Sequence, residues 1–259
     1  MARNTYGLDL GSYEIKVYDK KQDTIWKEKN VLAVQDKKEI IAIGEDAYQM
    51  YEKTPPDIEV VFPMRDGVIS RFNDMQNLLQ NILKKNRHFS RGAEYVIAVP
   101  TDVTEVQKKA FFDLVIHSNA KAREVNIVER SIADAVGLGI DVQNTTGVMI
   151  INFGGETTEL SVLTEGGIVF NRLLKLGGTT LDQEIVNLVR NSHDFLIGSR
   201  TAEILRQQFD VFNGDSETAF SVAGRDLITG LPMRKTISIT LVRAAFKDTL
   251  LECMKAVRS

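Results

Sequence analysis

Short apolar runs alternate with longer amphipathic stretches along this chain. Residues 6–10, 95–99 and 148–151 are each mostly apolar and are soon followed by a glycine or a proline, which predicts buried strands. Apolar positions at helical spacing predict one amphipathic helix from Phe72 to Leu83 and another from Thr101 to His117. Strands that alternate with helices in this way indicate an α/β protein with a buried, partly parallel sheet.

The rest of the pattern extends this alternation. It predicts further strands at 31–34, 40–43, 125–128 and 160–163, extended stretches at 218–228 and 235–239, and helices at 45–53, around 181–189 and 202–209, and from 241 to 257. A helix rich in alanine is expected between the strand at 125–128 and Gly137.

One pattern occurs twice, at the start of the chain and again near its middle. In both places an apolar strand runs into a glycine turn and then into a return strand. When Asp9 is aligned with Asn152, Gly11 falls on Gly154 and Ser12 falls on Gly155. The chain therefore contains two related halves, each opening with a glycine-turn hairpin.

Such turns are open to two interpretations. Glycine lets backbone amides approach a polyphosphate without a Cβ atom in the way, and hydroxyls of Ser12, Thr157 and Thr158 could add donors. Asp9, two residues before Gly11, could hold a magnesium ion through water. The alternative is that each glycine only closes a hairpin. Two matched turns favour the nucleotide site.

Composition excludes several classes of protein. Among 259 residues, 43% are apolar and 26% are charged, and the net charge is −3, which gives no reason to expect a nucleic-acid partner. The single cysteine, Cys253, excludes an internal disulfide framework. No apolar run approaches the roughly 20 residues that span a bilayer. The loop 87–91 (RHFSR) either touches a membrane surface or is simply solvated.

Several motifs together give a specific resemblance. Residues 7–12 (GLDLGS) resemble the first phosphate motif of the actin, heat-shock chaperone and sugar kinase superfamily. Residues 152–159 (NFGGETTE) resemble the second phosphate motif of the MreB family, D-[IL]-G-G-G-T-T-[ED], and residues 63–69 (PMRDGVI) are similar to another MreB stretch. The similarity runs in order along essentially the whole chain. The chain is thus identified as a member of the MreB/Mbl family of bacterial actin homologues.

This resemblance implies an actin-like fold of two lobes with a nucleotide between them. The first lobe would span residues 1–140, with a core at 1–30 and 62–140 and a small subdomain at 31–61. The second would span 141–259, with a core at 141–180 and 239–259 and a small subdomain at 181–238. Family members continue beyond the position of Ser259 with a strand and a glycine turn, so we expect a truncated chain. Apolar faces should then be exposed on 148–151 and on the last helix.

The resemblance also implies the cofactors, ATP and Mg²⁺, and the residues of the site. The residues expected to bind nucleotide are Gly11, Ser12, Tyr13, Gly154, Gly155, Glu156, Thr157, Thr158, Gly177, Gly178, Glu203 and Arg206. Asp9 and Asn152 are expected at the metal, and Asp9, Glu129 and Arg130 occupy catalytic positions.

Several of these positions depart from the family. Arg130 stands where the family has the glutamate that orients the attacking water, and an arginine offers no acceptor. Asn152 replaces an aspartate, Glu156 replaces a glycine, and residues 13–15 (YEI) replace A-N-T. Either backbone amides still bind ATP normally, or the chain binds ATP weakly or hydrolyses it slowly or not at all. Arg130 and Glu156 could pair with each other or with the phosphates.

As for function, the resemblance implies a filament subunit under the cytoplasmic membrane. It would assemble with itself or with MreB-family subunits, at the periphery of the cytoplasm, and help the cell-wall synthesis machinery set cell shape. Two alternatives remain. One is a non-polymerising regulator of MreB filaments, and the other is an ATP-hydrolysing enzyme or kinase of the same superfamily.

Overall fold

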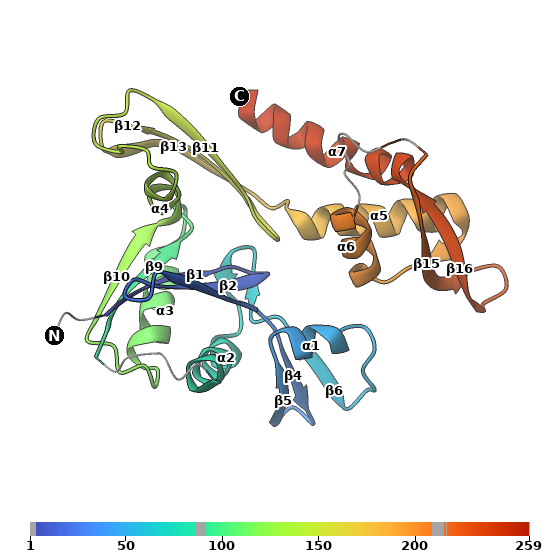
Figure 1. The fold of residues 1–259 in the computed structure, drawn as a ribbon, viewed down its shortest axis with the longest axis horizontal. Helices are drawn as coiled ribbons and strands as arrows, with labels where there is room; N and C mark the ends of the chain where they lie inside the picture. The colour runs from blue at the N-terminus through green and yellow to red at the C-terminus, as the bar shows by residue number, and fades with distance from the viewer. Residues whose placement is uncertain (1–3, 86–91, 209–214, 216, 259) are drawn as a thin grey trace. The chain divides into compact units, whose positions relative to one another are not determined.

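The computed structural model describes residues 4–85, 92–208, 215 and 217–258. The chain divides into two compact units, residues 1–175 and 176–259, which are described separately below (Figure 1). The lobe boundary near residue 140 and the small subdomains at 31–61 and 181–238 follow from the family resemblance and stay predictions. The loop 87–91 and Phe209, the predicted end of a helix, lie outside the described residues.

A five-stranded sheet forms the centre of the first unit (Figure 1). Its order is β10–β9–β1–β2–β3, built from β1 (Thr5–Leu10), β2 (Glu14–Asp19), β3 (Thr24–Lys29), β9 (Glu94–Val99) and β10 (Glu124–Glu129). Strand β1 runs parallel to β9 and antiparallel to β2, and β9 runs parallel to β10. The predicted α/β class and the partly parallel sheet are confirmed.

Two helices bury their apolar faces on this sheet, α2 (Phe72–Lys85) and α3 (Glu105–Ile116). The core includes Met75 and Ile82 from α2 and Phe111 from α3, all fully buried. Helix α3 begins later than the pattern predicted because Thr104 caps it: its hydroxyl accepts a hydrogen bond from the backbone N–H of Gln107, whose side chain accepts from the N–H of Thr104.

Smaller elements surround the central sheet. A three-stranded sheet is built from β4 (Leu32–Gln35), β5 (Glu39–Ile43) and β6 (Ile58–Val61), with α1 (Glu45–Met50) packed on it. A short hairpin, β7 (Met64–Arg65) and β8 (Val68–Ile69), turns at Asp66 and Gly67, both with positive φ. Only glycine adopts that conformation without cost, which suits Gly67 to the turn.

A second antiparallel sheet completes the first unit, with β11 (Val148–Phe153), β12 (Thr158–Thr164) and β13 (Gly167–Leu174). One face packs on α4 (Arg130–Gly137) through Ile150 and Leu163, which contact Ala135. The side chains of Met149, Ile151 and Phe153 point to the opposite face and are about half exposed. The apolar exposure predicted for this strand is confirmed.

The second unit is a small helical and β assembly with its own core. Helices α5 (Gly178–His193), α6 (Ser199–Gln208) and α7 (Ile239–Arg258) accompany a sheet of β14 (Phe195–Leu196), β15 (Ala219–Asp226) and β16 (Pro232–Ser238). Phe195, Leu205 and Val242 meet in the core. Leu251 and Met254 of α7 are exposed, as predicted for the last helix. None of the helices in the described segments is long and apolar enough to cross a membrane.

Candidate nucleotide site

The first glycine turn joins β1 to β2. The backbone N–H of Gly11 donates to the carbonyl of Glu14 over 3.1 Å. A Cβ atom added to Gly11 would lie 2.8 Å from that same carbonyl oxygen, so a larger residue does not fit without moving the backbone. The side-chain amide of Asn30 donates to the Gly11 carbonyl over 2.7 Å and braces the turn from β3's end.

The second glycine turn, between β11 and β12, repeats this arrangement. The N–H of Gly154 donates to the carbonyl of Thr157 over 2.8 Å, and an added Cβ would lie 2.9 Å from it. Gly154 therefore occupies in its turn the place that Gly11 occupies in the first, as the alignment of Asp9 with Asn152 predicted. Thr158, fully buried, opens the return strand β12.

The two turns lie against each other within the first unit. A Cβ atom on Gly155 would come within 2.6 Å of the Cβ of Tyr13, so glycine is required for this approach. The Tyr13 ring packs edge-on against the Tyr48 ring. The Lys29 ammonium lies 3.5 Å from the centroid of the Tyr13 ring. Tyr13, a predicted nucleotide contact, thus links the two turns to the small sheet.

A third segment, the β7–β8 turn, contacts both glycine turns. The N–H of Gly67 donates to the hydroxyl of Ser12 over 3.1 Å, and the N–H of Asp66 donates to the Glu156 carboxylate over 2.7 Å. Lys175 pairs with the Asp66 carboxylate at 2.7 Å. The PMRDGVI segment noted in the sequence therefore contacts both glycine turns.

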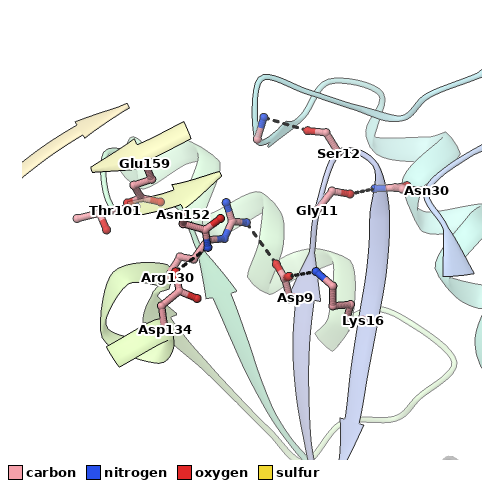
Figure 2. Close-up of polar contacts among 11 residues, drawn as sticks. Asp9, Gly11, Ser12, Lys16, Asn30, Thr101, Arg130, Asp134, Asn152 and Glu159 are labelled. Carbon is pink, nitrogen blue, oxygen red and sulfur yellow. Dashed lines mark hydrogen bonds and ion pairs between the residues drawn. The ribbon is translucent and has the colours of Figure 1, made fainter. Parts of the chain in front are cut away.

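A charged cluster stands beside the first turn (Figure 2). One Asp9 carboxylate oxygen accepts from the Lys16 ammonium over 3.0 Å, and the other lies 3.5 Å from Nη2 of Arg130. Figure 2 shows the Arg130 guanidinium between Asp9 on β1 and Asn152 on β11. Arg130 thus pairs with Asp9, whereas the Glu156 carboxylate accepts from the backbone N–H of Asp66 in the β7–β8 turn.

Asn152 bonds a second carboxyl group. Its side-chain amide donates to Asp134 over 2.6 Å. Burial raises the pKa of Asp134, while the hydrogen bond from Asn152 and the charge of Arg130 oppose that rise. The pairing holds the Asn152 side chain against α4.

The two residues expected at magnesium are thus both engaged by protein groups. Asp9 is flanked by two cations, and Asn152 presents a donor to Asp134. Magnesium prefers carboxylate oxygens and water, so this set does not suit it. Among the described residues there is no group of three or more His, Cys, Asp or Glu side chains that could hold a metal ion.

Glu129 and its neighbour Arg130 face different surroundings. Glu129 ends β10 and lines a groove together with Lys108 and Ile140, whereas Arg130 opens α4 and reaches Asp9. Adjacent residues at a strand-to-helix junction point in different directions, which explains the separation. Of the predicted catalytic residues, the structure brings together Asp9 and Arg130 and leaves Glu129 apart.

Sequence reasoning missed several polar residues of the site. Lys16 lies directly across from Asp9 in the β1–β2 register, and Asp134 follows Arg130 by one helical turn, so both were accessible from spacing. Glu159, which is 4% exposed, lies across from Asn152 and accepts from the N–H of Thr101 over 2.9 Å. Its acceptor Oε2 finds no hydrogen-bond donor in the described part of the chain.

The remaining predicted residues form a cluster in the second unit. Gly177 precedes α5, and a Cβ on Gly178 would lie 3.3 Å from the Arg206 guanidinium. Arg206 makes a bidentate pair with Asp182, at 2.6 and 3.1 Å. Burial raises the pKa of Asp182, opposed by Arg206. Glu203, buried on α6, accepts from Gln207.

Comparison with known proteins gives a consistent result. The family model described as MreB/Mbl protein matches residues 3–259. The cell shape-determining protein MreB of Escherichia coli K12 is 33% identical over 266 residues, covering 99% of this chain and 76% of the relative. The cell shape-determining protein Mbl of Bacillus subtilis 168 is 30% identical over 257 residues, covering 97% and 76%.

Solved structures agree. MreB 5 of Spiroplasma citri bound to AMPPNP superimposes with a TM-score of 0.91 at 30% identity, covering 99% of this chain and 78% of that one. A MamK double helical filament matches with a TM-score of 0.78 at 20% identity, covering 99% and 79%, which supports the fold alone. The predicted actin-like fold is confirmed, and the chain belongs to the MreB/Mbl family.

Proposed function

We propose that this chain is a nucleotide-binding subunit of a bacterial actin-like filament that contributes to cell shape. Its curated relatives carry the name cell shape-determining protein, and the MreB 5 structures are bound to AMPPNP and to ADP. The observation that carries the proposal is the matched pair of glycine turns, closed by equivalent Gly11 and Gly154 hydrogen bonds and adjoining at Tyr13 and Gly155.

The ligand is an adenine nucleotide, ATP or ADP. Glycine residues at the two turns let phosphate oxygens approach backbone N–H groups without a Cβ atom in the way. Lys16 and Arg130 add positive charge close to the first turn, which favours a phosphate there.

Hydrolysis is slow or absent in this proposal. Transfer of a phosphoryl group to water requires an acceptor that aligns the water, and Arg130 has only donors. Glu129 lines a separate groove and does not replace the missing carboxylate. The chain is at most a slow ATPase.

Family membership supports a cellular setting for this proposal. We place the chain in the cytoplasm beneath the membrane, assembling with itself or with MreB-family subunits and serving the cell-wall synthesis machinery. The alternative is that the chain regulates such filaments without polymerising itself. The following experiment distinguishes a filament subunit from such a regulator.

Sedimentation and a fluorescent ADP analogue test the proposal together. The chain should bind the analogue, unlabelled ATP should displace it, and nucleotide should increase the fraction that pellets. Phosphate release should stay near background. Pelleting only in the presence of an MreB-family partner would identify a regulator. A chain that neither binds the analogue nor pellets under any condition contradicts the proposal.

A further inference from the structure

Arg130 has unmet hydrogen-bonding capacity at the centre of the site. Only 11% of its side-chain surface is exposed. Within the described part of the chain, its Nε and Nη2 atoms are buried and donate no hydrogen bond. Buried guanidinium groups are normally paired or hydrogen-bonded, because leaving such donors unmet is unfavourable. The position therefore calls for an acceptor that the described residues do not supply.

Asp9 satisfies only part of this requirement. The Arg130 Nη2 to Asp9 Oδ1 distance of 3.5 Å is long for a charge-assisted hydrogen bond. The other Asp9 oxygen is already bound by Lys16 at 3.0 Å. Lys16 and Arg130 therefore share the Asp9 carboxylate, and the Asp134 carboxyl group, which also interacts with both cations, bonds the Asn152 amide. An anion with several oxygens would accept from the Arg130 donors that these carboxyl groups do not bond.

The same arrangement opposes a divalent cation. A metal ion at Asp9 would lie close to the charges of Lys16 and Arg130, and like charges at short range repel. Asn152 offers no carboxylate, and its amide nitrogen is directed at Asp134. The positive charge that a metal would bring to a phosphate is already present in the two side chains.

We propose that Arg130, together with Lys16, binds a nucleotide phosphate directly, so that this chain binds nucleotide without a divalent cation. A guanidinium binds phosphate oxygens through paired N–H donors, and Nε and Nη2 are two donors that make no hydrogen bond to any described residue. This inference rests on the proposed function, because it concerns the phosphate of the same bound nucleotide.

The experiment measures affinity for a fluorescent ADP analogue with magnesium present and with EDTA. Wild-type affinity should change by less than about threefold between the two buffers. Arg130→Gln should weaken binding in EDTA by about tenfold or more, because one charged contact is lost. It should also bind more tightly with magnesium than with EDTA, because one of the two cations near Asp9 is gone.

Two further variants make the test specific. Arg123→Gln removes an exposed arginine before β10 and should leave both affinities unchanged. Arg130→Lys keeps the charge without the paired donors and should lie between wild type and Arg130→Gln. If Arg130→Gln does not fold, as judged by thermal melting, the affinity of Arg130→Lys still tests the role of Arg130. The wild-type measurement in EDTA still tests metal-free binding.

The outcomes separate the two proposals. Wild-type binding that disappears in EDTA leaves the nucleotide function standing and overturns metal-free binding. Equal affinities for wild type and Arg130→Gln overturn the role of Arg130. A lack of binding in both buffers overturns both proposals.

Discussion

The two glycine turns share a backbone and differ in chemistry. Gly11 and Gly154 make the same hydrogen bond to the carbonyl three residues later, and each is restricted to glycine by the same close approach. Around the first turn stand a carboxylate and two cations, whereas the second is followed by Glu156, which bonds the Asp66 amide. The steric requirement is the same at the two turns, whereas the neighbouring charges, which the backbone does not constrain, differ.

The largest effect should come from adding a methyl group at either turn. Gly11→Ala and Gly154→Ala should each lower the free energy of unfolding by about 2–3 kcal/mol, because a backbone carbonyl lies within contact of the new Cβ. Urea denaturation measures this. Gly137→Ala is the control: space around Gly137 is open, so it should be neutral or slightly stabilising. A large difference between the free energies lost by the two variants would show that the turns do not share one steric restriction.

The next effect concerns Asn152, the counterpart of Asp9. Asn152→Ala should lower the free energy of unfolding by about 1–2 kcal/mol at neutral pH, because the partly buried Asp134 carboxylate loses its amide donor. The pKa of Asp134 is already raised above 3.8 by burial, and losing the donor raises it further.

The stability of this fold should depend on pH through Asp134. Because its pKa is raised on folding, the free energy of unfolding decreases as the pH rises from 3.8 to the raised pKa. The loss caused by Asn152→Ala should therefore shrink below that interval, where Asp134 is protonated in both states. Urea denaturation across this pH range checks it, and a loss independent of pH would refute the assignment.

A smaller effect is expected at Glu156. Glu156→Ala removes the acceptor for the Asp66 N–H and should cost about 1 kcal/mol. Glu156→Gln keeps an acceptor oxygen and should recover most of the loss. Hydrogen exchange of the Asp66 amide provides a direct measurement, with faster exchange in the alanine variant only. Equal exchange in both variants would show that this bond does not hold the β7–β8 turn.

The smallest effect belongs to the other bond of Asp66. Lys175 is 72% exposed, so its ion pair with Asp66 is screened by solvent. Lys175→Ala should change the free energy of unfolding by about 0.5 kcal/mol or less, and added salt should reduce even that difference. A loss as large as that of Glu156→Ala would reverse the ranking of the two Asp66 contacts.

Much of the fold could be predicted from hydrophobic periodicity, and its main omission has a physical reason. Strand β13 was not predicted because exposed and half-buried residues follow each other irregularly along it. In its pairing with β12, Val162 lies across from Phe170 and Leu163 lies across from Ile168, so Val169 is an extra residue in β13 that breaks the period of two on which strand prediction depends.

The site could be predicted in part. Glycine turns leave a mark in the sequence because sterics demand glycine, so Gly11 and Gly154 were found. Partners such as Lys16 and Asp134 were missed because a single charged residue carries no pattern until a pairing register or a helical turn brings it to its partner. The Glu156 bond to Asp66 joins residues 90 apart, which local spacing does not reveal.

That separation also bears on the order of folding. Each glycine hairpin closes through local contacts, but the bonds from Asp66 to Glu156 and from Thr101 to Glu159 join residues 90 and 58 positions apart. Contacts between distant segments carry a larger loop-closure entropy and tend to form late. During synthesis, the ribosome must release the chain past Glu159 before the site can assemble. All five strands of the central sheet, which end by Glu129, leave the ribosome earlier, so this sheet can pair before the two glycine turns are joined.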